Sequence, residues 1–345
     1  MKYTLAIIVL SVFLLTQCKT PPKEAEAEAE TEISDKELNE FVKESGQTLP
    51  VTAFREIWGY VVAGQEAALK KGLPLTDVGY FGAEVDTYGS LSNVPNRQNL
   101  SAFGGRVHLV AVCNGGALSY FSLLPESPQR KKLIEDLIAA TKNYDGLNID
   151  YENIPPRSGE AYISFLRELR EGLPKDKIFS VALAARTRKL TSDVYDYERI
   201  KPLVDKIFVM AYDEHWSGGP PGSVASLRWC RSVADYSMRV IGAEKLVMGI
   251  PFYGRAWEEQ NHHRALIFST IEKLIDTHKI KDIKRENGIP TFDYVPNVNV
   301  KVYYEDEYSL STRMEMYKSL NITGIGFWRI GQETPKVWGI IQIEK

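Results

Sequence analysis

The stretch Asp145-Gly146-Leu147-Asn148-Ile149-Asp150-Tyr151-Glu152 alternates apolar and polar side chains with the period of two that is typical of a β-strand. The apolar face consists of Leu147, Ile149 and Tyr151, which suit packing against a layer of helices. The opposite face consists of Asn148, Asp150 and Glu152. Carboxylates on a core strand are unfavourable unless that face borders a site. An edge strand with one solvated face is the alternative, but the flanking sequence indicates an internal strand, so the pattern favours a functional site.

Short apolar, β-branched or aromatic runs alternate with helical stretches from about Phe54 onward, which is the pattern of βα units. The predicted strands are Glu56–Val62, Asp77–Ala83, Arg106–Cys113, Gly146–Tyr151, Ile178–Ala184, Lys206–Tyr212, Lys245–Phe252 and Gly324–Trp328. Predicted helices include Arg130–Lys142, Gly159–Glu171, Val224–Val240 and Ser309–Leu320. Eight strands close a (β/α)8 TIM barrel, an α/β fold whose active sites lie at the carboxyl ends of the strands. Glu152 and Asp213 stand at two such ends.

The interval between the seventh and eighth predicted strands is the longest, from Trp257 to Glu307. It contains an apolar helical stretch at Ala265–Ile280 and a turn-rich stretch at Gly288–Val300. We interpret residues 258–307 as a small α+β insertion that rests on the upper face of the barrel.

The 345 residues allow one large α/β barrel or two ordinary domains, and a formal net charge of −3 gives no reason to expect binding to nucleic acid. We expect no cofactor and no metal, because no glycine-rich phosphate loop is present and the five histidines lack metal-ligand spacing. His262 and His263 are adjacent, and we interpret them as a solvated pair. Cys113 and Cys230 lie in apolar surroundings and are predicted to be small buried hydrophobes.

The N-terminus resembles an export signal. Lys2 precedes the apolar run Leu5–Leu15, which has the length of a secretory signal core and is too short to span a bilayer. Leu15-Thr16-Gln17-Cys18 resembles a bacterial lipobox, although Gln17 replaces the small residue that usually precedes the lipidated cysteine. We therefore predict a signal peptide over residues 1–18 and an extracytoplasmic protein that is anchored to the membrane by a lipid on Cys18. Ordinary secretion and an uncleaved anchor are the alternatives.

The residues after this signal have the composition of a spacer. Pro21-Pro22 and the glutamate–alanine alternation of Glu24–Glu30 offer nothing to bury, so residues 19–34 are predicted to be an acidic tether. Asp35–Glu44 could form a short helix, and residues 35–345 are predicted to form the barrel domain, which we expect to be a monomer.

The motifs at the predicted strand ends resemble those of glycoside hydrolase family 18, which contains chitinases and related N-acetylglucosaminidases. The opening stretch is similar to the family's Asp-Gly-x-Asp-x-Asp-x-Glu signature, with Asn148 in place of an aspartate. The other motifs are Met210-Ala211-Tyr212-Asp213, Gly249-Ile250-Pro251-Phe252-Tyr253-Gly254-Arg255-Ala256-Trp257 and Gly326-Phe327-Trp328. Four motifs in the family's order make the resemblance strong over roughly Phe54–Trp338.

A narrower resemblance concerns Asp213-Glu214-His215-Trp216 and the glycine- and proline-rich loop Ser217–Gly222. This combination resembles the branch of bacterial cortex-lytic peptidoglycan glucosaminidases, and an asparagine in the signature also occurs there and in chitobiase-like relatives. The long insertion of processive chitinases and a carbohydrate-binding module are not recognisable in the sequence, which favours peptidoglycan over crystalline chitin.

The resemblance implies a substrate-assisted mechanism, in which the substrate's own N-acetyl carbonyl attacks the anomeric carbon. Glu152 would then protonate the leaving oxygen and later activate water. Asp150 would hold the acetamido N–H, and Tyr212 would bind the acetamido oxygen; a tyrosine that only caps the core is the alternative for Tyr212. An aspartate in place of Asn148 would share a proton with Asp150, so the amide is expected to replace that protonated partner and to leave Asp150 without a like charge that raises its pKa.

Further residues of the motifs are candidates for substrate binding. Trp328 would form the floor beneath the sugar on the non-reducing side of the cleaved bond (the −1 sugar), unless it is a core tryptophan that closes the barrel. The second group of candidates for binding sugar hydroxyls or orienting the site consists of Asn148, Met210, Asp213, Tyr253 and Arg255. His215 and Trp216 would line the leaving-group side or merely pack within their loop.

The leading functional hypothesis is a retaining glycosidase that hydrolyses β-linked N-acetylglucosaminides in peptidoglycan or in chitin-type oligosaccharides. A carbohydrate-binding protein that has lost catalysis is one alternative, which the presence of Glu152 disfavours. An endoglycosidase that acts on N-glycans is another alternative, which the sequence does not separate from a cell-wall enzyme.

Overall fold

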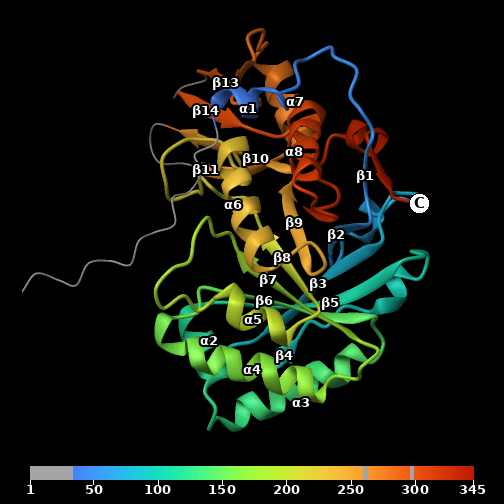
Figure 1. Cartoon of the computed structure of the whole chain (residues 1–345), viewed down its shortest axis with the longest axis vertical. Helices are drawn as coiled ribbons and strands as arrows, with labels where there is room; N and C mark the ends of the chain where they lie inside the picture. The colour runs from blue at the N-terminus through green and yellow to red at the C-terminus, as the bar shows by residue number, and fades with distance from the viewer. Residues whose placement is uncertain (1–33, 259–262, 296–298) are drawn as a thin grey trace, which may run out of the picture. The chain divides into compact units, whose positions relative to one another are not determined.

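The computed structural model describes residues 34–258, 263–295 and 299–345. Eight parallel strands form a ring in the order β2-β15-β9-β8-β7-β6-β5-β3, and pairing of β2 with β3 closes it (Figure 1). Their bounds are β2 Glu56–Val62, β3 Asp77–Val85, β5 Arg106–Asn114, β6 Gly146–Glu152, β7 Ile178–Ala184, β8 Lys206–Met210, β9 Leu246–Pro251 and β15 Gly324–Trp328. The predicted (β/α)8 TIM barrel is confirmed, although β8 ends at Met210 rather than at Tyr212.

Helices cover the outside of the barrel, and α3 and α4 lie side by side in Figure 1. The α-helices outside the insertion are α1 Asp35–Asn39, α2 Gly116–Leu123, α3 Pro128–Thr141, α4 Gly159–Gly172, α5 Tyr197–Ile200, α6 Leu227–Val240 and α8 Glu307–Ser319. The 3-10 helices are η1 Glu66–Ala68, η2 Arg97–Leu100, η3 Pro156–Ser158, η4 Lys201–Leu203 and η5 Pro335–Gly339. Two short strands, β1 Thr52–Phe54 and β16 Ile341–Ile343, pair in parallel, and β4 Leu91–Ser92 runs antiparallel to β3.

The four helices predicted outside the insertion begin and end close to their expected positions. Their sequences explain this, since α4 buries Tyr162, Phe165, Leu166 and Leu169 at helical spacing. The side chain of Ser226 caps the amino end of α6 and accepts a hydrogen bond from the Trp229 N–H.

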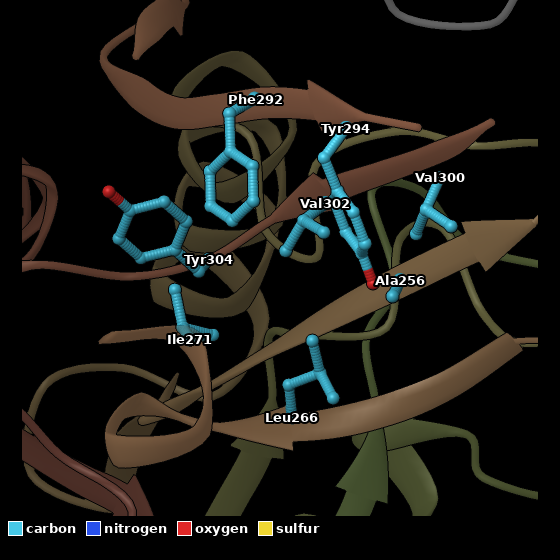
Figure 2. Packing of buried hydrophobic residues seen from close by; sticks show 8 residues of the cluster. All are labelled: Ala256, Leu266, Ile271, Phe292, Tyr294, Val300, Val302 and Tyr304. Atoms are coloured by element: carbon cyan, nitrogen blue, oxygen red, sulfur yellow. The ribbon is translucent and has the colours of Figure 1, made fainter. Parts of the chain in front are cut away.

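The insertion between β9 and β15 is a five-stranded antiparallel sheet with one helix (orange in Figure 1). Its elements are β10 Tyr253–Glu258, β11 His263–Ile267, α7 Phe268–Thr277, β12 Lys284–Glu286, β13 Ile289–Tyr294 and β14 Val300–Tyr303, with the strands in the order β11-β10-β14-β13-β12. Its own core is shown in Figure 2, where Leu266, Ile271 and Phe292 pack with Tyr304 and neighbouring side chains.

The insertion differs from its predicted outline in three places. Its first strand begins at Tyr253, before the expected boundary at residue 258. Ala265 lies in β11 rather than in a helix, because β11 pairs with β10 over its whole length. The stretch Gly288–Val300, expected to be turns, contains β13. The pattern of a short apolar run does not distinguish a helix from a strand. These segments became strands because they pair with a neighbouring strand.

A buried polar cluster fills the amino end of the barrel. His108 Nε2 lies 2.7 Å from Asp77 Oδ1, and the Arg106 Nε donates to the same oxygen at 2.6 Å. Trp58 stacks on the His108 ring with centroids 4.3 Å apart. Burial alone would raise the pKa of Asp77, but the hydrogen bonds from His108 and Arg106 lower it to about 2. The cluster therefore holds an ionised carboxylate inside the barrel at the end opposite Glu152.

Residues Asp35–Lys345 form one compact unit. The segment after α1 binds α8, since the Lys43 N–H donates to Thr312 Oγ1 at 3.0 Å and the Gly46 N–H donates to the Tyr308 hydroxyl at 2.8 Å. The predicted signal peptide, the tether as far as residue 33, Cys18 and His262 lie outside the described residues. Among the helices that the structure describes, none has the length and apolar composition needed to cross a bilayer.

Candidate active site

The two faces of β6 meet different surroundings. On the outer face Leu147 and Ile149 are fully buried, and Tyr151 stacks on Phe165 of α4 with ring centroids 5.5 Å apart. On the inner face Asn148 is fully buried and Asp150 is only 7% exposed. The strand lies between β5 and β7, so it is internal as the sequence indicated.

Asn148 is fixed by hydrogen bonds to two other strands. The Tyr60 hydroxyl of β2 donates to Asn148 Oδ1 at 3.2 Å, and Asn148 Nδ2 donates to Ser180 Oγ of β7 at 2.8 Å. Asp150 Oδ1, in contrast, is buried and has no hydrogen-bond partner among the described residues. We expected the Asn148 amide to replace a protonated partner of Asp150. The structure does not show this contact, because the Asn148 amide nitrogen donates to Ser180 instead.

Asp150 is a carboxyl group that favours its neutral form. Burial, followed by the charge of Glu152, raises the pKa of Asp150 to about 8. The expectation that Asp150 would lack a like-charge neighbour that raises its pKa was wrong. Desolvation is the larger cause, and Glu152 supplies a like charge.

Glu152 stands at the carboxyl end of β6 and is partly buried. Burial and then the charge of Asp213 raise the pKa of Glu152 above its ordinary value. A carboxyl group with a raised pKa keeps its proton nearer to neutral pH, which is what a general acid requires.

Asp213 is held by two residues of the insertion. The Tyr253 hydroxyl donates to Asp213 Oδ1 at 2.5 Å, and Arg255 donates to the same oxygen from Nη2 at 2.6 Å and from Nε at 3.0 Å. Tyr253 and Arg255 occupy alternate positions of β10, so both side chains lie on one face of that strand. The first strand of the insertion therefore forms one wall of the site.

Two cavities adjoin these carboxyl groups. The first, which we call the Asp150 cavity, has a volume of about 180 Å³. It is lined by Asp150, Glu152, Met210, Tyr212, Asp213, Tyr253, Arg255, Ala265, Trp328 and Gln332. The second, which we call the Trp216 cavity, has a volume of about 480 Å³ and is lined by Tyr151, Glu152, Asn153, Ala184, Ala185, Tyr195, Met210, Tyr212, Asp213, Trp216 and Trp229. Four residues line both cavities, namely Glu152, Met210, Tyr212 and Asp213.

The structure places Trp328 on the wall of the Asp150 cavity and also against the barrel core. Its ring lies 5.0 Å from that of Phe81 and 5.4 Å from that of Tyr60, measured between centroids. The peptide bond between Trp328 and Arg329 is cis. Both positions considered from the sequence, a sugar floor and a core residue, are therefore compatible with its surroundings.

His215 and Trp216 both lie in the loop after Asp213, but their side chains have different surroundings. His215 Nδ1 lies 2.8 Å from the Ser223 carbonyl oxygen, so this ring packs within its own loop. Trp216 is 59% exposed and lines the Trp216 cavity. A Cβ on Gly218 would lie 2.4 Å from the indole, so the glycine backbone forms a close backing for the ring.

Several residues near the site carry no motif and were missed in the sequence. Tyr195 follows β7, and its hydroxyl donates to the Tyr151 carbonyl at 3.0 Å while it accepts from the Ile154 N–H at 3.2 Å. Trp229 comes from α6, and Gln332 follows β15. The tertiary fold brings each of these residues to the site from a different part of the chain. The only sequence signal for any of them is that Gln332 lies four residues after Trp328.

Within the described ranges, no group of three or more His, Cys, Asp or Glu side chains is placed to hold a metal ion. Cys113 and Cys230 are buried, as the sequence indicated, and burial raises the pKa of each thiol to about 11.

Comparison with known proteins gives consistent similarities. The model of Glycosyl hydrolases family 18 matches residues 86–333. The uncharacterized glycosylase YvbX of Bacillus subtilis is 33% identical over 225 residues, which cover 62% of this chain and 65% of that protein, slightly less than two thirds of its length. The cortical fragment-lytic enzyme of Bacillus subtilis is 25% identical over 296 residues, 79% of this chain and 69% of that protein.

Solved structures share the fold. The spore cortex-lytic enzyme SleL of Bacillus cereus has a TM-score of 0.73 at 23% identity, and the match covers 86% of this chain and 76% of that one. A chitinase of Chromobacterium violaceum has a TM-score of 0.74 at 18% identity, covering 83% and 97%. Because the family model spans well over half of the chain, this protein belongs to glycosyl hydrolase family 18.

Proposed function

We propose that the protein is a retaining glycosidase that hydrolyses β-linked N-acetylglucosaminides. The observation that carries the proposal is the position of Glu152, which lines both the Asp150 cavity and the Trp216 cavity. A glycosidic bond that passes from one cavity to the other would present its oxygen to a carboxyl group whose pKa is raised by burial. The smaller cavity would hold the −1 sugar, and the larger one would hold the leaving group.

The chemistry follows from the surroundings of each group. The acetamido oxygen of the −1 sugar attacks the anomeric carbon, while Glu152 transfers its proton to the leaving oxygen. Water activated by the same carboxylate then opens the oxazolinium ion, with retention of configuration. Asp150, which has an unpartnered buried oxygen, accepts the acetamido N–H and so orients the acetamido group for attack. Tyr212 lines the same cavity and binds the acetamido oxygen.

Peptidoglycan is the substrate that we place first. The relatives support this choice, since the names of two of them describe lysis of cortical fragments or of spore cortex. Chitin-type oligosaccharides and N-glycans present the same acetamido sugar and remain the competing substrates.

Product analysis tests the proposal. The protein is incubated in parallel with peptidoglycan, chitin oligosaccharides and an N-glycoprotein, next to its Glu152→Gln and Glu135→Gln variants. We expect Glu152→Gln to lower kcat by about 10²–10⁴-fold or more, because a general acid contributes that much. Glu135 is exposed on α3, and its variant should match the wild type. Turnover by Glu152→Gln above a few per cent of the wild-type rate would remove Glu152 as the acid.

We also propose that a lipid on Cys18 anchors the protein outside the cytoplasm, on the evidence of the lipobox-like sequence Leu15-Thr16-Gln17-Cys18. Labelling with a palmitate analogue should mark the wild type but not Cys18→Ser, which should leave the membrane fraction or remain as its precursor. An unlabelled wild type would contradict the anchor.

A further inference from the structure

Gln332 places a buried acceptor on the wall of the Asp150 cavity. Its Oε1 is buried and has no hydrogen-bond partner among the described residues. The residue lines the cavity together with Glu152, Tyr212 and Trp328. Buried carbonyl oxygens are nearly always paired, so an unpaired one on a residue that lines a cavity points to a donor that arrives with a ligand.

The backbone around Gln332 is fixed, so its side chain is presented from a set position. The Gln332 N–H donates to the Arg329 carbonyl at 3.3 Å, and the Gln332 carbonyl accepts from the Phe268 N–H at 3.2 Å. Gly331 precedes it with φ +92°, a conformation that favours glycine. Phe268 begins α7, so the contact ties this turn to the insertion.

The carboxylate acceptors Asp213 and Asp150 of the Asp150 cavity differ from Gln332 in charge or in availability. Asp213 Oδ1 already accepts from Tyr253 and Arg255. Asp150 is assigned to the acetamido N–H under the proposed function. Gln332 therefore offers a neutral acceptor that the mechanism does not use, and sugar hydroxyls are the neutral donors that a glycan supplies.

We propose that Gln332 is a specificity-determining residue that accepts a hydrogen bond from a free hydroxyl of the −1 sugar, an inference that rests on the proposed function. A sugar that lacks this hydroxyl leaves the amide oxygen unpaired in the bound state. A sugar in which the hydroxyl carries an ether substituent has no proton to donate and has extra bulk. The site therefore selects N-acetylhexosamine units that are unsubstituted at that position.

The kinetic test combines a variant with altered substrates. The substrates are 4-methylumbelliferyl di-N-acetylchitobioside and its analogues that lack the 3-hydroxyl or the 6-hydroxyl of the sugar next to the leaving group. The variants are Gln332→Met, which keeps the length of the side chain but removes the amide, and Gln98→Met as an exposed control outside both cavities.

For the wild type and Gln98→Met we expect one of the two deoxygenations to lower kcat/KM by about 10- to 100-fold, the range for an unpaired buried group. On the full substrate, Gln332→Met should have a kcat/KM that is lower than that of the wild type by a similar factor. On that deoxygenated analogue, the kcat/KM of Gln332→Met should fall little further. Equal losses for Gln332→Met and wild type on both analogues would overturn the inference.

A binding measurement separates this inference from the proposed function. The same sugars are titrated calorimetrically into Glu152→Gln and into Glu152→Gln combined with Gln332→Met. If the wild type does not hydrolyse the substrate but Gln332 alone accounts for the loss of affinity on deoxygenation, the proposed function fails and the role of Gln332 stands. If hydrolysis occurs while the affinities of the two proteins respond identically to each deoxygenation, the role of Gln332 fails and the function stands. Absence of both binding and hydrolysis would overturn both.

Discussion

Asp150, Glu152 and Asp213 are three carboxyl groups that border the Asp150 cavity but have different surroundings. Asp213 receives hydrogen bonds from the Tyr253 hydroxyl and the Arg255 guanidinium. Asp150 has a buried oxygen without a donor, and burial moves its pKa to about 8. Glu152 is partly buried between them, with a raised pKa. Glu152 combines a raised pKa with a position on both cavities, whereas Asp150 lines only the Asp150 cavity, and this combination favours Glu152 as the proton donor.

The raised pKa of Asp150 predicts a pH-dependent loss of stability. Between the unfolded pKa of about 3.9 and the folded pKa of about 8, the native state binds more protons than the unfolded state, so the free energy of unfolding falls as pH rises. Asp150→Asn removes this dependence. Relative to the wild type, the variant should gain on the order of 3 kcal/mol between pH 5 and pH 8, at about 1.4 kcal/mol for each pKa unit. Urea unfolding at both pH values measures the gain, and parallel pH profiles for the two proteins would contradict it.

Residues at strand ends could be placed from the sequence, whereas residues that arrive from elsewhere could not. Alternation along β6 and the end of β8 located Glu152, Asp150 and Asp213, because strand direction and period fix such positions. The pKa of Asp150 could not be predicted, since it depends on burial, which is a property of the whole barrel. Gln332 lies in a turn whose geometry depends on a contact with α7.

At the level of elements, the loop from Asp213 to Ser226 carries Trp216 to the wall of the Trp216 cavity. The Glu214 carboxylate accepts from the Ser226 N–H at 2.7 Å and from the Ser226 hydroxyl at 3.0 Å, so it closes the loop where α6 begins. Arg313 of α8 donates to the Ala225 carbonyl at 2.6 Å and pairs with buried Glu305. These bonds hold the base of the loop, and the glycines allow its tip to fold closely around Trp216.

Gly218→Ala should disturb the position of Trp216. The new Cβ would lie 2.4 Å from the indole, so the ring must shift. We expect KM for oligosaccharides that extend into the Trp216 cavity to rise about 3- to 10-fold with kcat nearly unchanged, because a binding contact is lost equally from substrate and transition state. Gly104→Ala is the matched control, since its Cβ would meet nothing within 4 Å. An unchanged KM for long substrates would show that Trp216 does not bind them.

The barrel strands and the insertion differ in how well the sequence predicted them. The barrel strands are runs of buried side chains separated by amphipathic helices. A sequence in which strand patterns and helix patterns alternate in this way is compatible with few folds other than an α/β barrel or an open α/β sheet. In the insertion, Ala265-Leu266-Ile267 fits either a helix or a strand. Its pairing with β10 is a long-range contact that the local pattern does not contain.

On the scale of the whole molecule, the barrel encloses polar groups at both ends, and these groups have opposite properties. At the amino end the buried Asp77 carboxylate is paired, since it receives hydrogen bonds from Arg106 and His108. At the carboxyl end Asp150 has a buried oxygen without a partner, next to a cavity. Paired buried charges indicate a structural role, whereas unpaired groups that face a cavity indicate a site for a ligand.

Asp77→Asn should destabilise the barrel in a pH-dependent way. The folded pKa of Asp77, about 2, lies below its unfolded value of about 3.9. Its contribution to stability is therefore present above the unfolded pKa and is lost as pH falls through 2. We expect a loss of about 3 kcal/mol at pH 7, because Arg106 and His108 lose their buried partner, and a smaller loss at pH 3.

Urea unfolding at the two pH values checks this expectation. Asp136→Asn is the control, since Asp136 pairs with Lys132 on the exposed face of α3, and loss of such a pair changes stability by less than about 1 kcal/mol. Equal effects of the two substitutions would contradict a structural role for the buried cluster.

The central claim, that the acetamido group of the substrate acts as the nucleophile next to Glu152, is tested most directly by removing that group. The measurement compares kcat for 4-methylumbelliferyl di-N-acetylchitobioside with kcat for the analogue in which the sugar next to the leaving group carries a free amine. Loss of the internal nucleophile should lower kcat by more than about 10³-fold, since an oriented intramolecular group supplies a large part of the rate enhancement. Similar rates on the two substrates, or a covalent glycosyl adduct trapped on Asp150 or Asp213, would contradict the mechanism.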